Sequence, residues 1–404
     1  MLRVEEALER ILAEITRLEP ETAPLPQALG RVLAQSLASK EEMPPFANSA
    51  MDGYALRSSD TQAASRQTPR RLRLVGAVQA GHVAERTVGA GESMRILTGA
   101  PVPPGADAVI QQELTQTGEG WVEVQAPVAQ GNNVRHAGED IRRGTVVLQD
   151  GAPIGPAEIG VLASLGIAEV TVYRRPVVAI LATGDELVEV HEALRPGQIR
   201  NSNSYLVAAA VTRAGGIPRP LGIARDRVEE LRAKLQAAQE ADLIITSGGV
   251  SVGDYDLVKD IMREQGIIDF WRVNLRPGKP LAFGRLGGTP LLGLPGNPVS
   301  AAVTFELFAR PVLRKMQGFR QALRPMAQAR LLEDFEDTGN RRHYVRAQVQ
   351  WRDGAFVATT TGPQGSHILT SMLGANALLI IPENSPPLPA GALVQAMLLV
   401  EGLD

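Results

Sequence analysis

The sequence predicts a chain of several domains that combines one α/β domain with two β-rich regions. Its 404 residues exceed what one ordinary hydrophobic core accommodates. From Pro176 to about residue 320, buried apolar strands alternate with helical patterns, which predicts a parallel sheet covered on both faces. Short strands punctuated by Gly, Pro and Asn precede this region, and further short strands follow it. The expected fold class is therefore α/β plus β.

The elements before the α/β region are a helix, a set of strands and a second helix. Apolar residues recur at helical spacing from Val4 to Leu18, and Pro20 is expected to close that helix. After Pro44, short runs predict the strands of a β-rich insert, namely RLRLVGAV, SMRILTG, DAVIQQ and WVEVQA. A further helix is expected from Pro156 to Gly166, because Pro suits the first turn of a helix.

The α/β region contains six expected strands and four expected helices. The strands are VVAILATG, PRPLGIARD, DLIITSGG, and three runs near FWRVN, PLAFG and PLLGLPG. The helices are one capped near Asn201, VEELRAKLQAAQ, DLVKDIMRE, and the long VSAAVTFELFARPVLRKM. Beyond residue 321, the runs HYVRAQVQW, AFVATTT, ALLIIP and VQAMLLV predict a small β domain.

Composition excludes several classes of function. The net charge of -3 gives no electrostatic case for nucleic acid, which usually requires a basic face. The sequence contains no run of about 18 apolar residues, so no membrane span is predicted. The acidic, amphipathic N-terminus does not resemble a signal peptide. Cysteine is absent, which excludes disulfides and thiolate sites and agrees with a cytoplasmic location. Any metal must therefore bind oxygen or imidazole ligands.

The first candidate binding segment is Thr183-Gly184-Asp185-Glu186, which directly follows a predicted strand. Ligands of open α/β sheets bind beyond the carboxyl ends of strands. Gly184 lets the backbone approach a ligand, and the two acids can orient a hydroxyl or a hard cation. The alternative is a plain turn whose acids favour the next helix N-terminus. Taken by itself, this motif favours the plain turn.

The second segment is TSGGVSVGDYD, from Thr246 to Asp256. Its glycines allow backbone N–H groups to converge on an anion, as phosphate-binding loops do. The two aspartates of this segment lie where a metal that bridges phosphates would need ligands. Asp256 could instead cap the following helix. A simple glycine-rich turn is an equally weighted alternative.

The third segment is RPGKP followed by LPGNPVS. Arg276 and Lys279 flank a stiff Pro-Gly turn, which presents two cations suited to phosphate or another oxyanion. The run from Pro295 to Pro298 ends a strand and opens a helix whose free N–H groups favour an anion. Solvated surface is the usual alternative for such cations. Three polar segments after strands of one sheet together predict a phosphorylated ligand with a divalent hard metal.

These segments belong to a longer series of motifs with a recognisable resemblance. The motifs are PPFANSAMDGYALR, RILTGAPVPPGADAVIQQE, GNNVRHAGEDI, ATGDEL, GQIRNSNSYL, TSGGVSVGDYD, RPGKPLAFG and LPGNPVSA. They resemble, in order from Pro44 to about Lys315, the molybdopterin molybdenumtransferase family, to which the C-terminal region of gephyrin also belongs. A weaker similarity follows at residues 362–382. Eight long motifs in the same order are highly specific.

The resemblance implies an elongated multidomain subunit. It would comprise a discontinuous linking domain (residues 1–43 and 144–175), a β-rich insert domain (44–143), a molybdopterin-binding α/β domain (176–320) and a C-terminal β-barrel domain (321–404). The family is homodimeric, and its cleft is shared between the α/β domain of one subunit and the insert domain of the other. The implied reaction uses adenylylated molybdopterin, molybdate and Mg²⁺, and yields molybdenum cofactor and AMP. Partners would include the adenylyltransferase and apo-molybdoenzymes.

The resemblance also assigns residues. Glu186 and Asp256 would handle metal and ligand. Asp226 of GIARD, Asp52 of SAMDGYA and Thr98 of LTGAPVP would be further catalytic residues, the last two contributed by the partner subunit. Without the resemblance, Asp52 fits an Asx turn and Thr98 a strand end. The residues expected to bind substrate are Gly184, Asp185, Ser247, Gly248, Gly249, Arg276, Lys279, Pro295, Gly296, Asn297, Pro298 and Ser371. Asn376 also matches the C-terminal motif.

Two alternative functions remain at this point. A molybdopterin adenylyltransferase has a similar α/β domain but lacks the insert motifs between residues 44 and 141. A gephyrin-like scaffold without catalysis would be expected to carry a long disordered linker or a second enzyme domain, and neither is expected from this sequence. The sequence does not discriminate molybdate from tungstate, because the two oxyanions have nearly the same size and charge.

Overall fold

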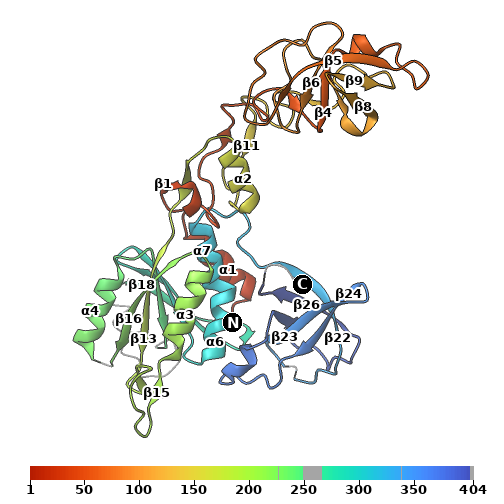
Figure 1. Ribbon diagram of the computed structural model, residues 1–404. Coiled ribbons are helices and arrows are strands. Elements are labelled where there is room, and N and C mark those ends of the chain that lie inside the picture. The colour runs from red at the N-terminus through yellow and green to blue at the C-terminus, as the bar shows by residue number, and fades with distance from the viewer. Residues whose placement is uncertain (226, 249–265, 338, 401–404) are drawn as a thin grey trace.

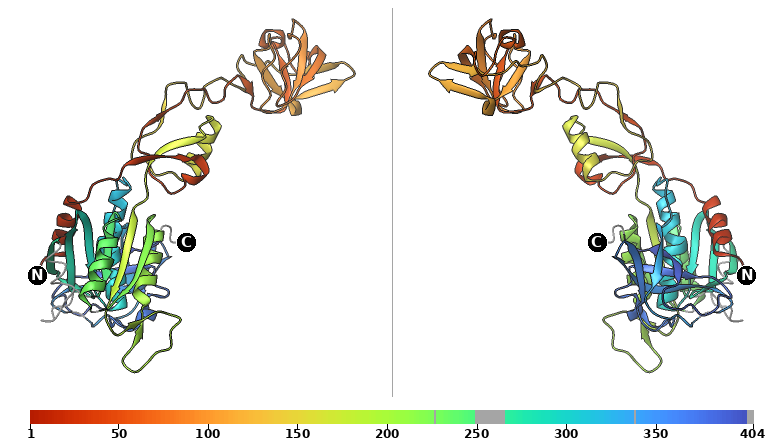
Figure 2. Two further views of the ribbon diagram at one scale, coloured as in Figure 1. Left: turned by 90° about the vertical axis from the view of Figure 1, so that its left-hand side faces the viewer. Right: turned by 90° about the vertical axis from the view of Figure 1, so that its right-hand side faces the viewer.

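The protein is elongated, with the insert at one end and the α/β domain beside the C-terminal domain at the other (Figures 1 and 2). The computed structural model describes residues 1–225, 227–248, 266–337 and 339–400. A narrow linking region joins the two ends. The elongated multidomain arrangement is thus confirmed. Asp226, Gly249, Asp256 and the helix expected after Asp256 lie outside the described residues.

The insert is built on one six-stranded sheet. Its strand order is β7 (Ala108–Gln111), β4 (Gly53–Leu56), β6 (Glu92–Ile96), β5 (Arg70–Val78), β9 (Trp121–Val124) and β8 (Thr115–Gly118). The four runs predicted as strands all form strands of this sheet. Gly53 is required where β4 meets β7, because an added Cβ atom would lie 1.9 Å from the carbonyl oxygen of Ile110.

Short antiparallel strand pairs and one helix form the linking region. The pairs are β1 (Pro20–Pro24) with β12 (Glu169–Tyr173), β2 (Leu37–Ala38) with β11 (Val146–Leu148), and β3 (Asn48–Ser49) with β10 (Val134–Arg135). The helix α2 (Pro156–Ser164) begins at the predicted proline. Each pair joins a segment that precedes the β4 strand to one that follows β9, so two antiparallel chain segments support the insert.

The N-terminal helix α1 (Val4–Ala13) is shorter than predicted and packs against the α/β domain. The prediction that it extends to Pro20 was wrong: the chain leaves the helix after Ala13 and forms β1 at Pro20. Ile15 is nevertheless buried in the same core as α1, and the Leu18 N–H donates to the carbonyl of Met316. The apolar pattern continued past the helix because the extended segment packs on the same surface.

The α/β domain contains a six-stranded mixed sheet. Its order is β16 (Ile217–Ala224), β13 (Val177–Thr183), β17 (Leu243–Ser247), β21 (Thr289–Leu294), β20 (Pro280–Leu286) and β18 (Gly266–Arg272). The first four strands are parallel, as predicted, but β20 and β18 are antiparallel to their neighbours. The predicted parallel sheet is therefore present, and two antiparallel strands extend it at one edge. Gly287 and Gly288 form a two-residue turn with φ of 56° and 93°, so β20 and β21 close a hairpin.

Helices cover both faces of this sheet, as the sequence predicts. On one face lie α1, α3 (Ser202–Arg213) and a continuous helical segment made of α6 (Pro298–Thr304), the π-helical η4 (Phe305–Ala309) and α7 (Arg310–Met316). On the other lies α4 (Val228–Ala238). Alternate residues of β13 face the two layers: Val178 and Ile180 face the first, Ala179 and Leu181 the second. None of the described helices is long and apolar enough to cross a membrane.

The C-terminal domain is a closed five-stranded barrel, which confirms the predicted architecture. Its strands are β23 (Arg342–Arg352), β24 (Ala355–Thr360), β22 (Met326–Leu331), β26 (Leu393–Leu398) and β25 (Ala377–Ile381), and pairing of β25 with β23 closes the barrel. The short strand β19 (Leu275–Arg276) of the α/β domain pairs with β23. This pairing fixes the barrel beside the carboxyl ends of the parallel strands.

One barrel residue should make stability depend on pH. Burial lowers the pKa of His343 to about 4, and only 1% of the residue is exposed. The unfolded chain binds a proton near pH 6.5, so the folded state keeps its full stability above that pH and loses about 3 kcal/mol as pH falls from 6.5 to 4. Urea denaturation of wild type and His343→Gln at pH 7 and pH 4 should show the smaller loss in the variant. Equal losses in the two proteins would contradict this expectation.

Candidate active site

A cleft of about 790 Å³ opens where β13, β17 and β21 end, between the α/β domain and the barrel. Ligand sites of open α/β sheets are expected at this position. The structure brings nine of the predicted site residues together in its lining: Glu186, Ser247, Gly248, Arg276, Lys279, Pro295, Gly296, Asn297 and Pro298. The three polar segments, which are up to 112 positions apart in the sequence, therefore form one site.

Glu186 is an exposed acid at this cleft, and Gly184 shapes its position. Gly184 has a φ of 141°, and an added Cβ atom would lie 2.4 Å from the Glu186 carboxylate. Glycine is therefore needed for the carboxylate to fold back over the turn. Gly184 and Asp185 do not themselves line the cleft among the described residues. The carbonyl of Asp185 accepts a hydrogen bond from Arg225 at 3.0 Å, so this part of the motif has a structural contact.

The RPGKP turn presents two cations in different environments. Arg276 makes two hydrogen bonds, of 2.7 and 2.9 Å, to the carboxylate of Asp337 in the C-terminal domain. The half-buried Lys279 has no ion-pair partner in the described part of the chain. Between them, Gly278 has a φ of 105° and an added Cβ atom there would lie 2.6 Å from Thr304 Oγ1. The turn is thus packed against α6, and Lys279 is the cation more available to a ligand.

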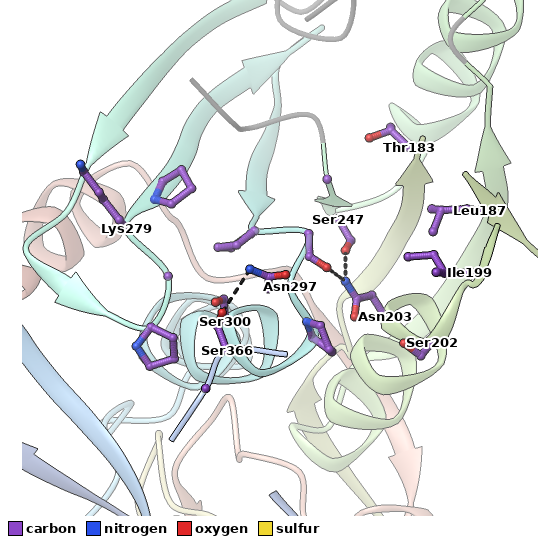
Figure 3. Close-up of a pocket in the computed structure, with 18 of the residues that line it drawn as sticks. Thr183, Leu187, Ile199, Ser202, Asn203, Ser247, Lys279, Asn297, Ser300 and Ser366 are labelled. Carbon is purple, nitrogen blue, oxygen red and sulfur yellow. Dashed lines mark hydrogen bonds between the residues drawn. The ribbon is translucent and has the colours of Figure 1, made fainter. Parts of the chain in front are cut away.

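The LPGNP segment places the start of α6 at the cleft. Helix starts carry unpaired N–H groups and a partial positive charge. A loop from the barrel meets this end: Val299 N–H donates to the carbonyl of Ser366 at 3.3 Å, and Asn297 Nδ2 donates to Ser366 Oγ at 3.2 Å (Figure 3). The C-terminal domain therefore contributes a wall of the cleft, through Gln364, Gly365 and Ser366.

Charge in the cleft favours an anionic ligand. Among the described lining residues, four are basic (Arg200, Arg276, Lys279 and Arg341) and one, Glu186, is acidic. The positive end of α6 adds to this excess. No group of three or more potential His, Asp or Glu metal ligands occurs among the described residues. The described cleft is therefore suited to an oxyanion more than to a protein-only metal cage.

Several lining residues were not singled out from the sequence. Asn203 lies at the start of α3 and hydrogen-bonds Ser247 Oγ at 2.8 Å and the Gly296 carbonyl at 2.7 Å (Figure 3). Gln364 and Ser366 of the barrel also line the cleft. Asn203 belongs to the motif GQIRNSNSYL, so the sequence already indicated that this segment matters for the family. The sequence alone could not show that its side chain faces the glycine loops and not the solvent.

Ser371 does not line the cleft. It is buried on η5 (Leu369–Met372), where its hydroxyl donates to Ile368 O at 2.6 Å and accepts from Arg346 Nε at 3.1 Å. Arg346 is fully buried and also donates to the carbonyl of Gly365 at 3.2 Å. Burial lowers the pKa of Arg346 to about 10, which leaves it charged at neutral pH. Ser371 and Arg346 thus hold the barrel loop that carries Gly365.

Asp52 and Thr98 contact each other at the far end of the molecule. The carboxylate of Asp52 accepts hydrogen bonds from the Thr98 hydroxyl at 2.6 Å and from its backbone N–H at 2.7 Å. These two bonds hold the pKa of Asp52 below its usual range. Both residues are exposed on the insert. Within one chain, the insert lies at the opposite end from the cleft, so the structure does not bring this pair to Glu186 (Figure 2).

The architecture and the cleft define a class: a multidomain protein whose α/β domain receives an anionic ligand at its strand ends. Family models match the three parts of the chain. They are the MoeA N-terminal region (domain I and II) at residues 2–166, the probable molybdopterin binding domain at 179–315, and the MoeA C-terminal region (domain IV) at 328–399.

Similar proteins match over nearly the whole chain. Molybdopterin molybdenumtransferase 2 of Mycobacterium tuberculosis is 40% identical, with 96% of this chain and 97% of the relative covered. The Bacillus subtilis molybdopterin molybdenumtransferase is 36% identical, with 98% and 94% covered. The molybdopterin biosynthesis moeA protein of Pyrococcus horikoshii has a similar structure, with a TM-score of 0.84, 32% identity, and 98% and 100% of the two chains covered. The chain belongs to the molybdopterin molybdenumtransferase family, a family of transferases of molybdenum cofactor biosynthesis.

Proposed function

We propose that the protein transfers molybdenum from molybdate to adenylylated molybdopterin and releases AMP. The observation that carries this proposal is the cation-rich cleft at the strand ends, with Lys279 unpaired among the described residues and the α6 N-terminus beside it. Both substrates are anions, and bringing them together requires positive charge to offset their repulsion. The family membership supplies the identity of the ligands.

The protein's contribution to this reaction is positioning and electrostatic stabilisation. Lys279 and the start of α6 bind anionic oxygens and hold phosphate and molybdate in one cleft. Gly248 lets the chain after β17 pass close to the end of β13 at the cleft: an added Cβ atom there would lie 2.8 Å from the Thr183 carbonyl oxygen. No protein nucleophile is required, because the dithiolene sulfurs of the pterin bind the molybdenum. Holding the reactants in place lowers the entropic part of the barrier.

Magnesium fits the described residues as a substrate-bound cation. Mg²⁺ commonly binds one or two carboxylates together with substrate phosphates and water. Glu186, exposed at the cleft and opposite in charge to the metal, is the described residue that would hold it; Asp256 is the second proposed ligand. When bound, the ion would stabilise negative charge on the phosphate oxygens of departing AMP.

We further propose a homodimer that works in the cytoplasm. The insert residues Asp52 and Thr98 are assigned to the same reaction as Glu186, yet the elongated chain separates them (Figure 2). A second copy of the chain that places its insert against the cleft would bring Asp52 and Thr98 close to Glu186. Self-complementary dimers of this kind have two equivalent sites, each built from two chains.

The experiment that tests the proposed function is a reconstituted assay. The protein is incubated with adenylylated molybdopterin, Mg²⁺ and molybdate, and AMP release and cofactor formation are followed together. We expect both products only when molybdate is present. Formation of the adenylate from ATP and metal-free molybdopterin would instead identify the protein as an adenylyltransferase. Release of neither product would contradict the proposal.

A further inference from the structure

The side-chain amide of Asn203 has only one possible orientation. Its nitrogen Nδ2 lies 2.7 Å from the carbonyl oxygen of Gly296 and 2.8 Å from Ser247 Oγ (Figure 3). A carbonyl oxygen can only accept a hydrogen bond, so the group facing Gly296 must be the NH₂ and not the oxygen. Both amide hydrogens of Asn203 are therefore used by the protein, and they tie α3 to the ends of β17 and β21.

This orientation leaves the amide oxygen of Asn203 without a protein donor. Asn203 Oδ1 is buried and accepts no hydrogen bond from the described residues. Buried acceptors are nearly always paired, and an unpaired one destabilises the fold, so such an atom in a ligand cleft marks a place for a ligand donor. Asn203 is itself part of the cleft lining.

Apolar side chains flank the same part of the cleft. Leu187 and Ile199, from the paired strands β14 (Leu187–Val188) and β15 (Ile199–Arg200), lie on the side of Asn203, whereas Lys279 lies on the opposite side (Figure 3). Ile199 is 56% exposed although it is a large apolar residue. An exposed isoleucine next to an unpaired acceptor suits a flat ring whose face packs on apolar atoms and whose edge donates a hydrogen bond. The cleft is thus divided into a ring end and a charged end.

We propose that Asn203 Oδ1 accepts a hydrogen bond from an N–H group of the ligand's heteroaromatic ring, with Leu187 and Ile199 against the ring. This inference rests on the proposed function only for the identity of the ring: adenine carries its N–H donors on an exocyclic amine, and pterin carries an exocyclic amine and a ring N–H. The anionic end of the ligand then points towards Lys279. Asn203 is in this view a specificity-determining residue, because a ring without the N–H leaves Oδ1 unpaired.

Binding measurements with paired probes test the proposal independently of turnover. The first pair is AMP and N6,N6-dimethyl-AMP, and the second is 6-hydroxymethylpterin and its analogue methylated on the ring and amino nitrogens. We expect wild-type protein to bind the parent of one pair at least tenfold more tightly than its methylated partner, as measured by calorimetry. The pair that discriminates identifies which ring occupies this end of the cleft.

Two variants separate recognition from support of the fold. Asn203→Ala should bind the parent probe about tenfold more weakly, leave the methylated probe within twofold, and so abolish the discrimination. Asn297→Ala, an asparagine of the same cleft whose amide contacts Ser366, should keep the ratio between the two probes. A purely structural role of Asn203 would lower both affinities equally.

The proposal is overturned if wild-type protein binds both members of each pair alike or binds neither parent, a result that does not depend on any variant folding. It is also overturned if Asn203→Ala retains the discrimination. Failure of the molybdenum transfer assay together with clear discrimination between the probes would reject the proposed reaction while leaving the ring site in place.

Discussion

A mixture of Asp52→Ala and Glu186→Ala proteins should recover about a quarter of wild-type activity, although each protein alone is inactive. Asp52 directly precedes β4 of the insert and Glu186 follows β13 of the α/β domain, and these two domains lie at opposite ends of the molecule (Figure 2), so a cleft that uses both residues must take them from two chains. In a mixed dimer one cleft carries both substitutions and the other carries neither. Random exchange of equal amounts makes about half the dimers mixed, each with one intact site of two.

Subunit exchange must be confirmed for this result to be informative. Mass spectrometry of intact dimers gives the mixed fraction directly, and a mixture of two differently tagged Asp52→Ala proteins serves as the matched control, with no recovery expected. If mixed dimers form and activity stays absent at every mixing ratio, the shared cleft is wrong. Asp52 would then be a residue that only holds the Thr98 turn through its two hydrogen bonds.

Replacing Lys279 by alanine should weaken productive binding of the anionic substrate by about tenfold to a hundredfold at low salt. Lys279 lines the cleft and has no ion-pair partner among the described residues, so none of those residues neutralises its charge. A hydrogen bond to a charged group contributes about 1.5–3 kcal/mol. Because Lys279 is only half-buried, its attraction is screened by salt, and the difference between wild type and variant should shrink as salt rises.

The measurement is kcat/KM for AMP release at several salt concentrations. Lys40→Ala removes an exposed lysine from the linking region and is the matched control for loss of one positive charge. We expect Arg276→Ala to have a smaller dependence on salt, since Arg276 is already neutralised by Asp337. Equal values for Lys279→Ala and Lys40→Ala would show that the RPGKP turn does not bind the substrate.

The sequence by itself determined the elements and the position of the cleft in outline. The apolar runs that became β13, β17 and β21 could be predicted because a strand buried on both faces is a short continuous apolar segment. The polar, glycine-rich residues that follow each run also had to meet, because parallel strands end at the same edge of a sheet. The order of residues along the chain was therefore enough to predict that Glu186, Gly248 and Gly296 lie at the same edge of the sheet, where the structure places them in one cleft.

Only the tertiary structure decided how individual side chains are used. Arg276 pairs with Asp337, 61 positions away, and Asp52 accepts from Thr98, 46 positions away. Asn203 fixes its amide against a carbonyl 93 positions away. The periodicity of apolar residues along a strand or helix repeats every two to four residues, and it shows only which face of that element is buried. Partner choice across such distances depends on packing between elements that the chain brings together only when it folds, which is why the orientation of Asn203 was decided by the fold alone.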